Sequence, residues 1–142
     1  MKNKIYPIVV MSLMAFVDQV KAQNSLTVSI NQIKNKSGNI SIGIFNKKEG
    51  FLKEGFQLAK TKVRVADSSV SYTFKNLPKG YYAVAVFHDE NSDNQCNLNF
   101  IGIPKESYGF SNNFRPKLSA PNFNQTKFFV DGNREIKINL IH

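Results

Sequence analysis

Residues 26–30 read Leu-Thr-Val-Ser-Ile, and residues 40–44 read Ile-Ser-Ile-Gly-Ile. In both stretches apolar side chains alternate with small or polar ones, and this period of two is typical of a β-strand with one buried face. The polar run Asn35-Lys36-Ser37-Gly38 between them is rich in residues that favour turns. The two stretches therefore predict two half-buried strands with a turn between them.

Further strands are predicted along the rest of the chain. Residues 81–87 are apolar on both phases, which favours a central strand, and shorter alternating stretches predict strands around residues 63–65 and 70–74. Residues 50–58 show no period of two and predict a loop or one helical turn. Residues 126–130 and 136–140 flank Asp131-Gly132-Asn133, and they predict a hairpin because Asp-Gly is a preferred hairpin turn.

About seven short strands, no long helical pattern and no repeat predict an all-β fold. We expect one antiparallel β-sandwich over residues 23–142, with strands spaced along the chain as in immunoglobulin-like domains. Residues 97–124 interrupt that rhythm with three prolines and several aromatic residues. This stretch predicts one long loop, and its apolar side chains indicate that it folds against the sandwich.

The first 22 residues have the pattern of a signal peptide. Lys2 and Lys4 precede an apolar run, and Val20-Lys21-Ala22 offers small residues where a signal peptidase cleaves. The run is shorter than the roughly 20 residues that cross a bilayer, so we expect cleavage after Ala22 rather than a transmembrane segment. The mature protein is then expected in the periplasm or secreted.

The charge of the chain favours some partners over others. With 19 Lys and Arg against 10 Asp and Glu, the formal net charge is +9. The basic residues are scattered and form no nucleic-acid-binding motif, so we expect no nucleic acid partner and a basic surface attracted to anionic components of the cell envelope. Cys96 is the only cysteine, so no internal disulfide forms.

The chemistry of the chain is concentrated in residues 89–97, which follow the predicted central strand. Oxygen-bearing side chains alternate there, and Ca²⁺ takes six to eight oxygen ligands at about 2.3–2.6 Å. Position six of the loop, usually Gly in calcium loops, is Asn94, which also tolerates a left-handed backbone. The candidate ligands are Asp89, Asn91, Asp93, Gln95 through its backbone carbonyl, and Asn97.

Two observations limit this calcium hypothesis. Position twelve is Phe100, where an EF-hand carries a Glu, so the EF-hand is excluded and the remaining oxygens would come from Glu106, Asn99 or water. Asp, Asn and Ser also form turns after strands without any ion. The loop is therefore either a Ca²⁺ site or a polar turn, while zinc is disfavoured because soft ligands are scarce.

An enzymatic interpretation rests on His88, Asp89 and Glu106. Histidine titrates near neutral pH, and two carboxylates facing a cleft suit glycoside hydrolysis. His88 and Asp89 are neighbours on a strand, however, so their side chains point to opposite faces. A small extracytoplasmic hydrolase is thus the alternative to a non-catalytic module.

A longer block of sequence carries a family resemblance. Residues 76–84, Asn-Leu-Pro-Lys-Gly-Tyr-Tyr-Ala-Val, run into HDENSDNQCNLNFIGIPKESYGFSNN at residues 88–113. This block resembles the uncharacterised exported bacterial family called domain of unknown function 2141. The resemblance implies a prealbumin-like sandwich, an exported location and no established activity. The family's loop carries an acidic residue where this chain has Asn97, so one carboxylate is replaced by an amide.

The matching segments around Gly102–Glu106 and Gly109–Asn113 imply that this loop packs beside the acidic loop as one composite surface. We expect an exported, non-catalytic binding or structural module that presents Tyr108, Phe110, Asn112 and Asn113 to a glycan, a peptide or another envelope component. The alternative is that the aromatic residues only hold the loop against the core. The sequence specifies neither the ligand nor the oligomeric state.

Overall fold

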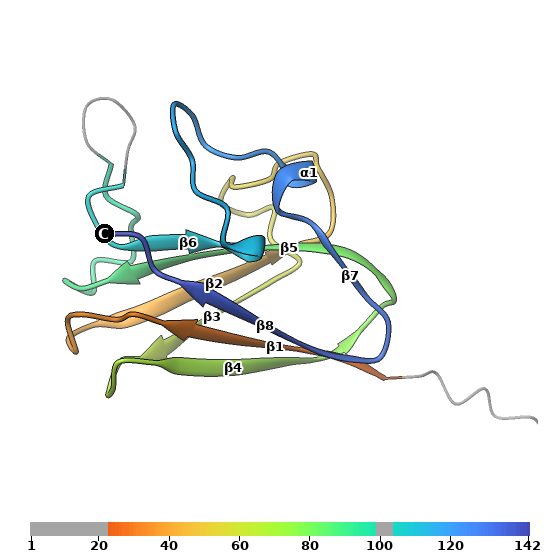
Figure 1. Cartoon of the computed structure of the whole chain (residues 1–142), viewed down its shortest axis with the longest axis horizontal. Coiled ribbons are helices and arrows are strands. Elements are labelled where there is room, and N and C mark those ends of the chain that lie inside the picture. Colours follow the sequence, from red (N-terminus) through yellow and green to blue (C-terminus); the bar gives the residue numbers. More distant parts are fainter. Residues whose placement is uncertain (1–22, 99–103) are drawn as a thin grey trace, which may run out of the picture.

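The computed structural model describes residues 23–98 and 104–142 of the chain. Two sheets face each other as a sandwich (Figure 1), which confirms the predicted all-β class. The three-stranded sheet has the order β4 (Val70–Leu77), β1 (Asn24–Asn31) and β8 (Asn133–Asn139). The five-stranded sheet has the order β3 (Ala59–Arg64), β2 (Asn39–Phe45), β5 (Gly80–Asp89) and β6 (Tyr108–Phe110), with β7 (Phe128–Val130) also paired to β5.

The alternation in the first two strands is what fills the space between the sheets. In β1, Leu26, Val28 and Ile30 are fully buried, and the Ile side chains of β2 lie opposite them in the same core. Burying apolar side chains on one face of each strand is the main favourable term in folding such a sandwich. Both strands were predicted at these positions.

Strand β5 is the centre of the larger sheet, as its two-sided apolar pattern predicted. It pairs with β2 along seven residues and with β6 through Ala85–Phe110, Val86–Gly109 and Phe87–Tyr108. Tyr82, Val84 and Val86 point into the main core. On the other face, Ala83 joins a second small cluster with Phe45 and Phe123.

One predicted pairing is wrong. The segments 126–130 and 136–140 do not form a hairpin, because β7 pairs with β5 in one sheet while β8 pairs with β1 in the other. The turn at Asp131-Gly132 therefore carries the chain across the sandwich. The β1–β8 pair is parallel, and it departs from the otherwise antiparallel pattern of the two sheets.

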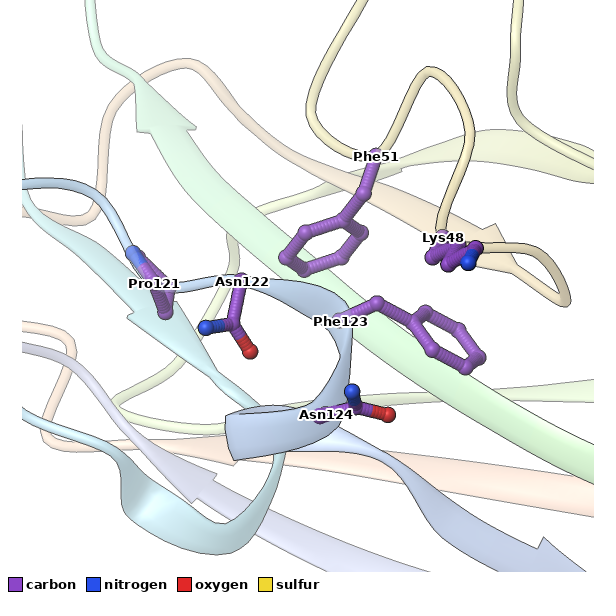
Figure 2. A pocket seen from close by; sticks show the side chains of 6 residues that line it. All are labelled: Lys48, Phe51, Pro121, Asn122, Phe123 and Asn124. Carbon is purple, nitrogen blue, oxygen red and sulfur yellow. The ribbon is translucent and has the colours of Figure 1, made fainter.

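The predicted long loop contains short elements of its own. After β6 come a 3₁₀ turn, η1 (Ser111–Asn113), and a single helical turn, α1 (Phe123–Thr126). Figure 2 shows how α1 meets the 46–58 loop, where the rings of Phe51 and Phe123 pack edge to face with centroids 5.9 Å apart. The two loops thus cover part of the outer face of the five-stranded sheet.

The predicted signal peptide, residues 1–22, lies outside the residues that the structure describes. Within residues 23–98 and 104–142, no helix has the length and apolar character needed to cross a membrane.

Candidate functional site

The acidic loop, residues 89–97, begins where β5 ends, and strand pairing brings Glu106 to it. The antiparallel register pairs Phe87 with Tyr108, and it continues through a 2.8 Å hydrogen bond from the His88 N–H to the Ser107 carbonyl. One step further along the same register places Glu106 opposite Asp89. The chain then closes on itself through the Lys105 N–H, which donates to the Asn97 carbonyl at 2.7 Å.

Asp89 closes the first turn of the loop. Its side chain is fully buried, and its two carboxylate oxygens accept hydrogen bonds from the backbone N–H groups of Asp93, at 3.1 Å, and Asn94, at 2.9 Å. Asn94 has φ of 65°, which is the left-handed backbone that an asparagine tolerates. A buried carboxylate needs such donors, because a buried charge without hydrogen bonds is costly.

Asp93 organises the second turn of the loop. Its carboxylate accepts the Gln95 N–H at 2.8 Å and the side-chain amides of Asn91 and Asn97, each at 2.9 Å. These hydrogen bonds, the one from Asn97 first, hold the pKa of Asp93 below its usual 3.8. Asp93 is therefore a stable negative charge on the exposed side of the loop.

Glu106 adds a third carboxylate to this group. Its Oε2 is buried and has no hydrogen-bond partner among the described residues. Burial raises the pKa of the Glu106 carboxyl above 4.5, and the negative charges of Asp89 and Asp93 raise it further, against the opposing effect of the Asn97 and Glu90 backbone N–H groups. The structure thus brings Glu106 into electrostatic contact with both aspartates.

His88 lies on the other side of the strand, away from this group. Its ring is fully buried, and Nε2 lies 2.7 Å from the Ser37 carbonyl in the turn between β1 and β2. Its Nδ1 is 3.7 Å from the Glu90 carboxylate, which accepts a 2.9 Å hydrogen bond from Asn35. His88 and Glu90 therefore fasten the acidic loop to the β1–β2 turn.

Sequence analysis did not foresee the part played by that turn. Gly38 has φ of 71°, and a Cβ at this position would overlap the Asp89 carbonyl oxygen and lie 2.8 Å from the Glu90 Cα. The only sequence signal was a glycine at the end of a polar turn. A glycine there lets the turn approach the start of the acidic loop.

The predicted calcium ligands are only partly assembled. Asp89, Asp93 and Glu106 come together with the Asn91 and Asn97 amides, whereas Asn99 and Phe100 lie outside the described residues. Gln95 supplies a backbone N–H to Asp93. Among the residues that the structure describes, no three His, Cys, Asp or Glu side chains gather closely enough to hold a metal ion by themselves. A cation here would need amide and carbonyl oxygens and water as well, which are ligands that Ca²⁺ accepts.

Cys96 lies in the same loop and is an exposed residue. Its pKa is raised, by partial burial of the sulfur and by the nearby Glu106 carboxylate. A raised pKa lowers the thiolate fraction at neutral pH, so this cysteine is a poor nucleophile.

The residues expected to face a partner are largely occupied within the chain. Phe110 is buried, and the Asn112 side chain donates to the Lys127 carbonyl at 3.0 Å. Asn113 donates to the Lys137 carbonyl at 3.2 Å and accepts the Asn139 N–H at 2.8 Å. These contacts tie η1 to β8, so the structure favours the alternative in which this segment holds the loop against the core.

A comparison with protein families places the chain in a family of bacterial proteins. A family described as an uncharacterized protein conserved in bacteria, DUF2141, matches residues 28–139. The chain belongs to the DUF2141 family. In this DUF2141 protein the match runs from within β1 to the end of β8, so the matched region includes strands of both sheets and the acidic loop. No curated protein and no solved structure matches the chain.

Proposed function

We propose that this protein is an exported, non-catalytic binding or structural module of the cell envelope. The observation that carries the proposal is the burial and the hydrogen bonding of His88 and Asp89. Both side chains are fully buried, and their hydrogen bonds go to the backbone of Ser37, Asp93 and Asn94. The residues best suited to acid–base chemistry therefore support the loop instead of facing a substrate.

The hydrolase alternative depends on Glu106, whose raised pKa is a property of general acids in glycosidases. A glycosidase also needs a second carboxylate that reaches the substrate. Asp89, the carboxylate beside Glu106, has no exposed surface. The structure thus favours the binding module over the hydrolase.

We further propose that the acidic loop is a Ca²⁺ site with Asp89, Asn91, Asp93, Gln95, Asn97 and Glu106 as its candidate ligands. The support is that the negative charges of Asp89 and Asp93 act on Glu106 in a basic chain, and that one oxygen of Glu106 is buried with no hydrogen-bond donor among the described residues. Each carboxylate oxygen still has lone pairs beyond those used by the loop's N–H groups. A cation at this point would offset the repulsion among the three charges.

Thermal unfolding in Ca²⁺ and in chelator tests the site. A protein that binds Ca²⁺ only when folded gains about 2.7 kcal/mol at a concentration a hundredfold above its Kd. Asp93→Asn and Glu106→Gln should each reduce this gain, because each removes a charged ligand and keeps the side-chain size. Asp131→Asn, in the exposed turn between β7 and β8, is the matched control and should keep the full gain.

Identical melting curves in Ca²⁺ and chelator would refute the calcium site while leaving the binding module standing. The exported location has its own test. Protein sequencing of the mature N-terminus should begin at Gln23, and a protein found in the cytoplasm with Met1 intact would contradict export.

A further inference from the structure

The segment between η1 and α1 is fastened at both of its ends. At one end, the buried Ser111 hydroxyl accepts the Val84 N–H at 2.9 Å and donates to the Thr126 carbonyl at 2.6 Å. At the other end, Asn122 caps α1 through reciprocal hydrogen bonds with Gln125. The intervening residues thus form a projection with fixed ends.

The projection carries an exposed apolar side chain that follows two cations in the sequence. Leu118 is fully exposed, at 101%, and it has the highest exposure among the large apolar side chains of the described residues. Arg115 and Lys117 beside it are also exposed, and no salt bridge is found for either among the residues described. Figure 1 shows this loop rising clear of the sheets next to α1.

The charged residues in the sequence around this segment are all positive. No acidic residue occurs between Glu106 and Asp131, whereas this stretch contains Arg115, Lys117 and Lys127. Lys48 of the neighbouring loop lines the hollow beside α1 (Figure 2), where its ammonium group is 3.7 Å from the Glu49 carboxylate, so it adds little net charge. An exposed leucine on a positively charged projection is complementary to a surface that is anionic outside and apolar just beneath.

We infer that residues 115–118 dock on an anionic lipid surface. Leu118 enters the boundary between headgroups and acyl chains, and Arg115 and Lys117 lie against the lipid phosphates. The inference takes from the proposed function only that the protein is an exported module. It supplies the partner class: an anionic membrane rather than a glycan or a peptide.

The leucine is what favours lipid over a dissolved polyanion. A soluble polyanion would use Arg115 and Lys117 but offers no apolar phase for Leu118, whereas a bilayer offers both. Each Lys or Arg near an anionic bilayer raises the affinity about fivefold, and burying a leucine raises it about tenfold or more. The contact is therefore weak and reversible, as for other single-site membrane contacts.

The chain lacks tryptophan, and this allows a direct test. Leu118→Trp places the only indole in the projection, and Leu98→Trp places one at a second exposed leucine, directly after the acidic loop, as the control. The protein purified after export is mixed, in chelator, with neutral phosphatidylcholine vesicles and with vesicles that also contain phosphatidylglycerol. We expect the emission of Leu118→Trp to shift to the blue with anionic vesicles only, and the emission of Leu98→Trp to stay unchanged.

Sedimentation with the same vesicles measures the contribution of each group. Leu118→Ser should weaken binding about tenfold, and Arg115→Gln with Lys117→Gln should weaken it roughly twenty-fivefold at low salt. Leu98→Ser and the pair Lys34→Gln with Lys36→Gln make matched changes in apolar surface and charge elsewhere. These control variants should bind within about twofold of the wild type, since surface changes away from the contact have small effects.

The inference would be overturned by no binding to anionic vesicles, by equal binding to neutral vesicles, or by equal losses for the projection variants and their controls. Binding that Leu118→Ser leaves unchanged would also overturn it, because the contact would then be electrostatic attraction alone. The chelator separates this test from the calcium test. Vesicle binding can fail while Ca²⁺ still stabilises the protein, and the reverse can also occur.

Discussion

Glu106 lies opposite Asp89 in the continued register of β5 and β6, and their negative charges act on each other. The two residues stand at opposite ends of the connection between β5 and β6, and the pairing of these strands brings them together. The acidic site is therefore a product of the fold rather than of a contiguous motif. Its properties should change when either the pairing or the charges are altered.

Glu106→Gln should raise the melting temperature at pH 7 in chelator, because it removes a partly buried charge and also the repulsion from Asp89 and Asp93. The folded state raises the pKa of this carboxyl above 4.5, so the folded protein holds the proton more tightly than the unfolded chain. The contribution of the Glu106 carboxyl to the stability of the wild type therefore becomes unfavourable as the pH rises from 4.5 through the pKa of the folded protein. Melting curves across this range should converge with those of the variant at low pH, and a constant difference would contradict the prediction.

Gly38→Ala should destabilise the protein by more than about 1 kcal/mol, since the new Cβ would overlap the Asp89 carbonyl and the backbone would stay at a positive φ. Gly55→Ala is the control, because Gly55 also has a positive φ, of 87°, but has open space around it. Urea unfolding measures both. Equal losses at the two positions would show that contact with the acidic loop adds nothing.

Ser111→Ala should cost about 1–3 kcal/mol, because it leaves the buried Val84 N–H and Thr126 carbonyl without their hydroxyl partner. Ser119→Ala, at an exposed position in the same loop, should change the free energy of unfolding by less than about 0.5 kcal/mol. Denaturant unfolding compares the two variants. A neutral Ser111→Ala would contradict the view that this hydroxyl holds the base of the projection.

Tyr82→Phe should change the stability of the protein at alkaline pH. Burial raises the pKa of the Tyr82 phenol above 10.0, so above pH 10 the unfolded chain loses this proton while the folded protein keeps it. Wild-type stability should therefore fall as the pH rises past 10, and the variant should lack this part of the fall. At pH 7 the variant loses about 1 kcal/mol with its hydrogen bond to the Pro78 carbonyl. Tyr72→Phe serves as the control, and an identical alkaline fall in the Tyr82 variant would contradict the argument.

Local patterns predicted the strands well but not all of their partners. The alternation of Leu26, Val28 and Ile30 depends only on which face is buried, so it is visible in the sequence. In the structure β7 pairs with β5 and β8 pairs with β1. Which strand each of them pairs with depends on which sheet edge is free in the assembled sandwich. A turn such as Asp131-Gly132 reports that the chain reverses, and it does not report which sheet the next strand joins.

The candidate site, like the fold, could be predicted from the sequence only where local residue types decide the structure. Asn94 could be predicted to take a left-handed backbone, since residue type alone governs that tolerance. Placing Glu106 with Asp89 required the β5–β6 register, and β6 is a three-residue strand that no periodicity marks. The contacts of Asn112 and Asn113 with distant backbone groups were equally hidden, because an exposed amide in a sequence looks the same whether it binds a partner or the chain itself.

The parallel pairing of β1 with β8 affects how the protein reaches its native state. β1 lies in the middle of its sheet, and β8, residues 133–139, supplies one of its two neighbours. Contacts between segments so far apart in sequence form slowly. A growing polypeptide therefore cannot complete this sheet before nearly the whole domain has been synthesised, because the last strand of the domain supplies one of the two neighbours of its first strand.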